Sequence, residues 1–471
     1  MADAGGAPEE LSAEQADATI TSRSYVVLLV VVSVIGVFVA VAAWLYVEGI
    51  YQIQQELFTH LPHALGYQNG PPNWWYLVVL GVAGVLVALA IGYLPGDGGH
   101  IPAKGLSAGG PSSPKILPGV VLAGLATTGF GLVLGPEGPL IALGAGLAIL
   151  LISLSSREVP PQALMVIGAA GSFTALAFIF TSPLIAAVIL IEATGLGGPK
   201  LRVVLIPGLL AAGIGTLVSL GIGGFTGLST SAYALGALPL HSIGHLKVGE
   251  FGWTIALAIV VAVVTSIVMR SGMLTYRFVS TRQLLLLLPL IALIIAGIAI
   301  GYSEASNKSI NYVLFDGQSQ LPGLVTQAGA WSFGTLAALI VCKGIAYSLS
   351  LGSFRGGPTF PAIFLGAAGG ILASHLPGFP EGAGVAVGIG AAIVGVLRLP
   401  LSAVVIATLL TTKAGSTVEP LIIVGVVVAY VVTLLLSRQR PESVNVPTTE
   451  PSPPPLPGPA PEPQPEPVGV S

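Results

Sequence analysis

Long stretches without a charged side chain are the feature that most constrains what this chain can fold into. Five of them reach or exceed the roughly 20 residues that a helix needs to cross the hydrocarbon of a bilayer. These are Ser24–Val47, Ile116–Pro136, Phe251–Met269, Gln283–Ser303 and Gly317–Cys342. Three longer apolar stretches each predict more than one span, or a span joined to a shorter helix: Leu57–Gly96, Val159–Ile191 and Val203–Leu246. The stretches are continuously apolar rather than alternating, which excludes a transmembrane β-barrel. The sequence therefore predicts an all-α polytopic membrane protein.

Composition agrees with this fold class. Apolar residues make up 54% of the 471 residues and charged residues only 8%, whereas a soluble domain carries about 25% charged residues. The formal net charge of −3 is too small to indicate a nucleic acid as a partner. Cys342 is the only cysteine, so no intramolecular disulfide can form. The expected environment is the lipid bilayer of the cell membrane.

The chain divides into three regions. Residues 1–22 are acidic and are expected to be a disordered N-terminus, residues 23–438 form the membrane domain, and residues 439–471 are Pro-rich and are expected to be a disordered tail. No basic segment precedes the first apolar stretch, so it is not a cleaved signal peptide. Arg23, Arg438 and Arg440 flank the membrane domain, while residues 48–103 contain no Lys or Arg. This distribution places both termini in the cytoplasm and predicts an even number of full crossings.

An internal repeat divides the membrane domain into halves of roughly 24–200 and 202–437. Gly135-Pro-Glu-Gly-Pro-Leu-Ile-Ala-Leu-Gly144 aligns with Gly357-Pro-Thr-Phe-Pro-Ala-Ile-Phe-Leu-Gly366, with six of ten positions identical. Downstream, Ser182-Pro-Leu-Ile-Ala-Ala-Val-Ile189 aligns with Leu399-Pro-Leu-Ser-Ala-Val-Val-Ile406. The same order and nearly the same spacing indicate two related halves.

The repeated motif has the parts of a broken helix. A Gly-Pro pair interrupts the incoming segment, and a second proline suits the first turn of a new helix. The free N–H groups and the macrodipole, about +0.5 charge, then attract an anion. Transporters built from repeats hold their substrates between such helix ends near the bilayer midplane. Ordinary Gly/Pro kinks are the alternative, and the repetition of the motif argues against it.

Only two acids, Glu137 and Glu192, lie inside otherwise apolar stretches. A charge at the bilayer centre costs at least about 2.5–3.5 kcal/mol, so each is a functional candidate. Glu137 stands where the helix beginning at Gly138 would offer its N–H groups. An ionised carboxylate would be held there, and a protonated one would leave the place to a diffusible anion. The alternatives are a Glu137 that stabilises only its own helix and a Glu192 that only caps a helix end.

These motifs resemble the CLC family of chloride channels and chloride/proton exchangers. Residues 129–139 resemble the family's Gly-Arg/Lys-Glu-Gly-Pro region, and residues 182–192 its following Ala-Pro-Leu segment, which ends in a Glu pair. Residues 357–361 stand in the place of its Gly-x-Phe-x-Pro motif, residues 398–401 in that of its late Arg-Ala-Pro-Leu, and residues 98–102 look like a variant of Gly-Ser-Gly-Ile-Pro. The resemblance covers most of residues 80–437 in the correct order.

The resemblance implies two inverted halves with broken and partial helices, and a homodimer in which each subunit has its own pore. It makes Glu137 the gating glutamate, and Glu137 and Glu192 the candidate proton path. The anion would lie between three elements, whose residues are Gly98, Gly99, His100, Ile101, Pro102, Gly135, Pro136, Gly138, Pro139, Gly357, Pro358, Thr359, Phe360 and Pro361.

Several side chains depart from the family pattern. Gly99 and His100 stand where the family has a serine, and Thr359 stands where it has a phenylalanine. The second member of the Glu pair, the inner proton-transfer carboxylate of many exchangers, is Ala193, and the family's late anion-binding tyrosine has no clear equivalent. An imidazole N–H of His100 could replace the lost hydroxyl, although a neutral His bonded to the loop backbone is the alternative.

The sequence is therefore interpreted as a CLC-like transporter of chloride or a similar small anion, uncoupled or only loosely coupled to protons. A strictly coupled chloride/proton or fluoride/proton antiporter is one alternative, and a pore for another anion such as nitrate is a second. An intramembrane enzyme is a third, but no Gly-x-Ser-x-Gly, His-Glu-x-x-His or phosphate-loop pattern supports it. No metal or cofactor is expected.

Overall fold

The computed structural model describes residues 12–106, 113–155, 159–195, 197–226, 235–280 and 283–438, and these residues form helices and loops without a β-strand. Eight of the described helices are long and apolar enough to cross a membrane. They are α2 (Arg23–Gln55), α4 (Asn73–Tyr93), α7 (Pro161–Phe180), α9 (Gly198–Thr226), α10 (Val248–Ser280), α11 (Leu284–Ser306), α13 (Phe333–Ser353) and α17 (Glu419–Arg438). The predicted all-α polytopic fold class is confirmed.

Shorter apolar helices stand between the long ones. They are α5 (Leu117–Thr128), α6 (Glu137–Ser153), α8 (Pro183–Thr194), α14 (Thr359–Ser374), α15 (Glu381–Leu397) and α16 (Pro400–Leu410). All six begin with a proline in the first turn or directly after one, as the fixed φ of proline and its missing N–H favour. Partial helices of this kind are what the repeated Gly-Pro motifs predicted.

The repeat reappears as a repeated order of elements. Helices α6, α7 and α8, of 17, 20 and 12 residues, correspond to α14, α15 and α16, of 16, 17 and 11 residues. Equivalent glycines make equivalent contacts. A Cβ on Gly144 of α6 would lie 2.4 Å from the carbonyl oxygen of Gly171 in α7, and one on Gly366 of α14 would lie 2.3 Å from that of Gly388 in α15. Small residues let these helix backbones touch, as is common in membrane bundles.

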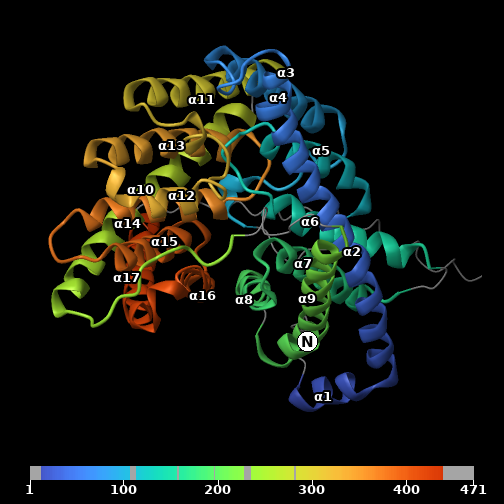
Figure 1. The fold of residues 1–471 in the computed structure, drawn as a ribbon. Coiled ribbons are helices and arrows are strands. Elements are labelled where there is room, and N and C mark those ends of the chain that lie inside the picture. Colours follow the sequence, from blue (N-terminus) through green and yellow to red (C-terminus); the bar gives the residue numbers. More distant parts are fainter. Residues whose placement is uncertain are drawn as a thin grey trace, which may run out of the picture.

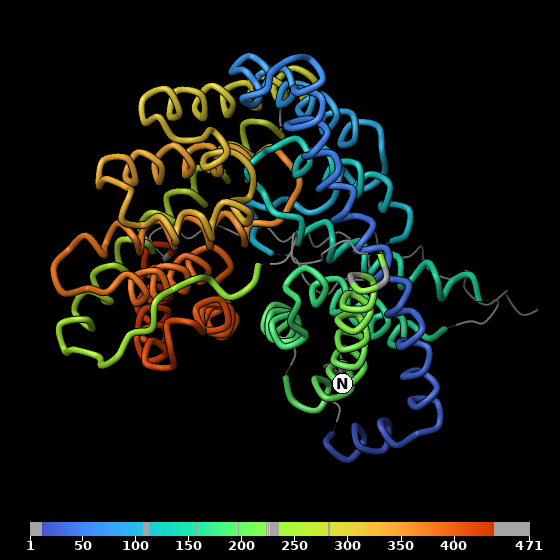
Figure 2. The backbone as a smooth tube through the Cα atoms, in the orientation of Figure 1, coloured from blue at the N-terminus to red at the C-terminus, as the bar shows by residue number. Residues whose placement is uncertain are grey.

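The two copies of the repeat occupy different sides of the molecule, and α9, most of which falls in the predicted second half, packs against α2 and α7 of the first. In Figure 1 the blue and green helices α2 and α6–α9 lie on one side, and the orange and red helices α13–α17 lie on the other. Helices α8 and α16 contact each other in the middle, and α4 packs against α11 at one end. The backbone tube shows the non-helical segment 235–247, which precedes α10, running beside the orange and red helices (Figure 2).

Three predicted spans are wrong in detail. The stretch Ile116–Pro136 is helical only to Thr128, because the glycines and the proline that follow it form an irregular segment. Within Gly317–Cys342, a short helix α12 (Leu321–Thr326) is followed by α13, which continues to Ser353. In the described part of Val203–Leu246, one long helix, α9, extends to Thr226, and residues 235–247 are not helical.

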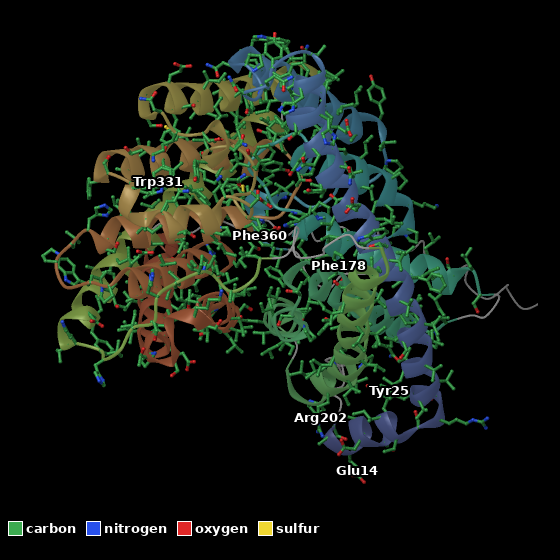
Figure 3. All side chains as sticks on the ribbon, viewed as in Figure 1. Glu14, Tyr25, Phe178, Arg202, Trp331 and Phe360 are labelled. Carbon is green, nitrogen blue, oxygen red and sulfur yellow. The ribbon has the colours of Figure 1, made fainter. Side chains whose placement is uncertain are left out.

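Part of the N-terminus that was expected to be disordered is a helix. Helix α1 (Ala13–Thr21) begins with a capping box in which the hydroxyl of Ser12 accepts from the amide of Gln15 and the side chain of Gln15 accepts from the amide of Ser12. Asp17 then forms a 2.8 Å ion pair with Arg202 of α9, in the region where Figure 3 labels Arg202. Residues 1–11 and the predicted Pro-rich tail 439–471 lie outside the described residues.

Candidate functional site

The two copies of the repeated motif meet through their backbones. Gly135 donates to the carbonyl of Gly357 at 2.8 Å, and Gly357 donates to that of Gly135 at 2.6 Å, so the segments that precede α6 and α14 form an isolated antiparallel bridge. The approach depends on glycine, since a Cβ on Gly138 would lie 2.6 Å from the carbonyl oxygen of Gly356. Irregular backbone at membrane depth is stable only when protein buries it or a cavity borders it.

Glu137 projects from this junction to the other half of the molecule. Its carboxylate is fully buried, and its Oε1 accepts a hydrogen bond of 2.5 Å from the amide of Thr359, the first residue of α14. The sequence interpretation had assigned the donors to the helix beginning at Gly138. That assignment is wrong, because α6 begins at Glu137 itself and the bridge places the N-terminus of α14 beside its side chain. A carboxylate thus stands where a helix N-terminus attracts anions.

The surroundings of the Glu137 carboxylate are closely packed, and their polar atoms are incompletely hydrogen-bonded. A Cβ on Gly357 would lie 1.9 Å from Cδ of Glu137, so the carboxylate lies directly on that glycine. Oε2 of Glu137 and Oγ1 of Thr359 form no hydrogen bond of regular geometry among the described residues, although the Thr359 side chain lies near the carboxylate. Phe360 stacks on Phe180 with ring centroids 5.4 Å apart, and Figure 3 shows Phe360 near the middle of the molecule. The incompletely bonded oxygens leave polar capacity for a proton or an anion.

Two buried tyrosines lie close enough to Glu137 to act on it electrostatically. The hydroxyl of Tyr347 donates to the carbonyl oxygen of Pro358 at 2.5 Å. The hydroxyl of Tyr46 is also buried and lies near the side chain of Thr128.

A cavity of about 150 Å³ adjoins Pro136, the residue before Glu137. Polar side chains contribute to its wall: Gln54, Gln55, Thr128, Asp316, Gln318 and Ser319. Asp316 lies close enough to Glu137 for their charges to interact. The cavity has polar side chains in its wall and is large enough to hold water beside the residue that precedes Glu137.

The first predicted anion-binding element, residues 98–102, follows α4 as a loop with an unusual backbone. Four successive residues have positive φ: Gly96 at +85°, Asp97 at +50°, Gly98 at +70° and Gly99 at +100°. A Cβ on Gly98 would lie 3.3 Å from Cγ of Arg355, which stands two residues before Gly357. The structure thus brings the first element against the segment that also carries the third one.

The sequence allowed His100 to be either an anion donor or a ring bonded to the loop backbone, and the structure shows the bond to the backbone. The Nε2 of His100 lies 2.8 Å from the carbonyl oxygen of Gly105 and must therefore donate to it. Part of the residue is exposed, but loss of hydration lowers the pKa of the ring. The bond to the Gly105 carbonyl raises this pKa, and the charges of Lys104 and Arg355 lower it further. A neutral ring with Nε2 already donating has no N–H left for an anion.

Glu192 caps a helix of the other half. Its carboxylate accepts from the amide of Leu401 at 2.9 Å, from the amide of Ser402 at 2.8 Å and from the hydroxyl of Ser402 at 2.7 Å. These donors belong to the first turn of α16, which has no side-chain cap of its own. Both oxygens are thus engaged across the contact between α8 and α16, as in the capping alternative.

We expect Glu192→Ala to lower stability more than transport. The change leaves two amides and a hydroxyl without their acceptor, which should cost about 1–3 kcal/mol, whereas the anion flux per folded molecule should stay near that of the wild type. Thermal unfolding in detergent and flux in liposomes measure the two effects. Glu14→Ala, which removes an exposed carboxylate from α1, is the matched control. An unchanged unfolding temperature together with a large loss of flux would contradict the capping role.

The sequence analysis missed three charged residues at or near this site: Asp316, Lys343 and Arg355. Lys343 and Arg355 are buried, and Asp316 borders the cavity next to Pro136. The signal for the two basic residues was present, because a Lys or Arg within an apolar stretch is as costly as an acid. Only acids were considered, and Lys343 was treated as the boundary of an uncharged stretch.

Comparison with known proteins gives the same assignment as the motifs. The family described as voltage gated chloride channel matches residues 98–434. Proteins named "Putative ion-transport protein YfeO" from Escherichia coli O7:K1 (strain IAI39 / ExPEC) and Shigella boydii serotype 4 (strain Sb227) are each 27% identical over 414 residues, which covers 85% of this chain and 90% of each of those proteins.

Solved structures share the fold. A slow cyanobacterial Cl⁻/H⁺ antiporter has a TM-score of 0.69 at 19% identity, covering 87% of this chain and 94% of its own. A CLC-type fluoride/proton antiporter has a TM-score of 0.61 at 17% identity, covering 88% of this chain and 97% of its own. Because the family match extends over more than half of the sequence, this chain belongs to the voltage gated chloride channel, or CLC, family.

Proposed function

We propose that this protein carries chloride or a similar small anion across the cell membrane, through a pore that Glu137 gates. The observation that carries the proposal is the hydrogen bond from the amide of Thr359 to the buried carboxylate of Glu137. An ionised Glu137 occupies the anion-attracting N-terminus of α14. A protonated Glu137 gives up this charge-assisted bond, and a diffusible anion then takes its place.

We assign each end of the molecule to one side of the membrane from the distribution of Lys and Arg. Helices α1 and α3 (Leu61–Ala64) lie at opposite ends of the molecule (Figure 1). The α1 end carries Arg23 and Arg202, and we assign it to the cytoplasm by the positive-inside rule. The residues from Glu48 to Ala103 contain no Lys or Arg until after α4 has crossed. The cavity beside Pro136 then faces outward, and the loop after α4 faces the cytoplasm.

We further propose that anion movement is uncoupled, or only loosely coupled, to protons. A proton that crosses the membrane needs a titratable station at each end of an apolar path. Glu137 can serve the outer end, while Ala193 cannot hold a proton and Glu192 is held by three donors of α16. Water that reaches Glu137 directly from the cytoplasm would be the route of any remaining coupling.

The deciding measurement is the reversal potential of the purified protein in liposomes under opposed chloride and pH gradients. A potential that follows the chloride gradient alone is the expected result, and protein-free liposomes are the control. A potential fixed by a constant chloride-to-proton ratio would establish strict antiport instead. The similarity in fold to chloride/proton and fluoride/proton antiporters is the reason to test that alternative directly.

The same liposomes decide which anion is carried. Flux is measured with chloride, fluoride or nitrate as the external anion, and we expect chloride to be among the anions that are carried. A flux seen only with fluoride would contradict the chloride proposal. Family membership favours transport over the intramembrane enzyme considered from the sequence. We also propose, from the family resemblance, a homodimer with one pore in each subunit, which cross-linking in the membrane would test.

A further inference from the structure

We infer that Tyr347 is a positioning residue for the gate, which strengthens the hydrogen bond that holds ionised Glu137 and so sets the pH at which the pore opens. This inference rests on the proposed function, because it assigns a second residue to the gate at the N-terminus of α14. Neither the family motifs nor the sequence analysis gave Tyr347 a role.

Tyr347 and Glu137 bond to opposite ends of one peptide group. Tyr347 is fully buried in α13, and its hydroxyl donates to the carbonyl oxygen of Pro358 at 2.5 Å. The amide of Thr359, which belongs to the same peptide group, donates to Oε1 of Glu137 at 2.5 Å. This peptide bond is trans, so its C=O and N–H point in opposite directions. The hydroxyl and the carboxylate therefore lie at the two ends of a single peptide dipole.

The direction of these two bonds makes them cooperative. A carbonyl oxygen can only accept, so the hydroxyl of Tyr347 must be the donor. A hydrogen bond to the carbonyl oxygen draws electron density away from the amide nitrogen, and the N–H of Thr359 becomes a stronger donor, as in other chains of hydrogen bonds. An ionised Glu137 gains more from a stronger donor than a protonated one does, because a charge-assisted bond is the stronger kind. Tyr347 thus stabilises the closed gate.

The other copy of the repeat lacks this arrangement. There the carbonyl of Pro136 accepts from the amide of Leu140 at 3.0 Å, as the carbonyl before a first helical turn usually does. Within the described chain, no backbone amide donates to the carbonyl of Pro358. The offset that aligns the two Gly-Pro motifs places Leu125 opposite Tyr347, and leucine has no donor. The tyrosine is therefore specific to the half whose helix N-terminus holds the gating carboxylate.

Other titratable groups act on Glu137 through charge alone. Asp316 acts electrostatically on Glu137, and Lys343, one turn before the tyrosine on α13, acts on Asp316. Tyr46 of α2 also lies within the electrostatic reach of Glu137. Helices α5, α6, α7 and α14 contribute no charged side chain except Glu137 itself. The hydrogen bonds of Asp316 and Lys343 lie within the segment 312–318, so removal of the tyrosine hydroxyl leaves them in place.

The test is the pH profile of chloride flux in Tyr347→Phe, measured in liposomes at a series of equal internal and external pH values. Polarisation of up to about 30% of a bond corresponds, for a bond to a charged group, to a roughly 2- to 5-fold change in how often the carboxylate occupies the site. We expect flux at alkaline pH to rise by this factor. The midpoint of the profile should move to higher pH by roughly 0.3–0.7 units.

Tyr25→Phe is the matched control. Tyr25 is also buried, and its hydroxyl donates to a backbone carbonyl, that of Val203, at 2.8 Å. Figure 3 shows Tyr25 near α1, away from Phe360 in the middle of the molecule. This variant loses the same kind of bond and should keep the wild-type midpoint.

A second background separates action on the gate from a purely structural role. Glu137→Gln has no ionised carboxylate to hold, so adding Tyr347→Phe to it should leave its flux unchanged. A structural defect would instead lower flux and thermal stability in both backgrounds. Incorporation of 3-fluorotyrosine at position 347 keeps the hydroxyl and makes it a more acidic, stronger donor, so the midpoint should move to lower pH. This variant decides the question if Tyr347→Phe does not fold.

Two results overturn the inference: an unchanged midpoint in folded Tyr347→Phe or in the fluorotyrosine protein, and an equal rise in flux when Tyr347→Phe is added to Glu137→Gln. Failure of the proposed function is a different result. It is shown if the wild type carries no chloride, or if Glu137→Gln alone keeps the wild-type pH profile.

Discussion

Glu137→Gln is expected to abolish the dependence of anion flux on pH while leaving substantial flux. In the wild type, a falling pH protonates Glu137, weakens its hydrogen bond to the amide of Thr359 and frees the N-terminus of α14 for the anion. Flux should therefore rise as pH falls. Glutamine has the same shape and no charge, so it mimics the protonated state at every pH.

The expected change in flux follows from the hydrogen bond between Glu137 and the amide of Thr359, which the variant weakens. A hydrogen bond to a charged group contributes about 1.5–3 kcal/mol, which corresponds to a roughly 10- to 100-fold change in how often the carboxylate occupies the site. At alkaline pH the variant should therefore conduct faster than the wild type by up to this factor. At acid pH the two should converge, because both side chains are then neutral.

Chloride flux from liposomes, measured across a series of equal internal and external pH values, checks this prediction. Glu304→Gln removes an exposed carboxylate of α11 that accepts from Asn73, and it should retain the wild-type pH profile. If Glu137→Gln also retains that profile, another group is the gate. Asp316 would then be the next candidate, because it borders the cavity beside Pro136.

The sequence predicted the architecture well because the bilayer leaves few alternatives. Uncharged stretches longer than a membrane crossing are expected to be helices, and the first Gly-Pro motif located the start of α6 to within one residue, Gly138 against the observed Glu137. Glu137 and Thr359 occupy equivalent positions of the repeat, so the contact between them joins the two halves at their common motif. Periodicity alone could not show that these positions meet, because the contact spans 222 residues.

The remaining features depend on tertiary contacts that a single sequence does not reveal. From the sequence, Glu192 could be either a proton carrier or a helix cap. The structure shows that its carboxylate accepts hydrogen bonds from the first turn of α16. His100 could have donated to an anion, but the carbonyl of Gly105 takes its Nε2–H. Arg355 stood out in the sequence only as a basic residue in an apolar stretch, because its bond to the carbonyl of Asp97, 258 positions earlier, appears only in the structure.

Lys343→Met is expected to destabilise the fold more than any other substitution considered for this chain. The ammonium of Lys343 is fully buried in α13 and donates to four successive carbonyl oxygens, those of Tyr312, Val313, Leu314 and Phe315, at 3.1–3.2 Å. It also lies 4.5 Å from the ring centroid of Phe364. An ammonium has three protons, so the four carbonyls share them and each carbonyl depends on this one side chain.

The turn that Lys343 holds adjoins the cavity beside Pro136. Phe315 has a φ of +58° and donates to the carbonyl of Gly131, in the irregular segment between α5 and α6. The next residue is Asp316, which borders the cavity beside Pro136 and acts electrostatically on Lys343. Methionine fills the same volume but donates nothing. Four carbonyls would then face an apolar interior, and the charge of Asp316 would lose its nearest counter-charge.

Breaking a buried interaction of this kind by removing one partner costs about 3–5 kcal/mol, so the unfolding temperature in detergent should fall by roughly 5 °C or more. Val341→Ala, at a position of the same helix that is 59% exposed, should change it little. Lys343→Arg keeps the charge, but a planar fork cannot point at four carbonyls as a compact ammonium does, so it should restore only part of the stability. Full stability of Lys343→Met would show that the turn from 312 to 315 finds other donors, and that α13 does not need this lysine to hold the wall of the cavity.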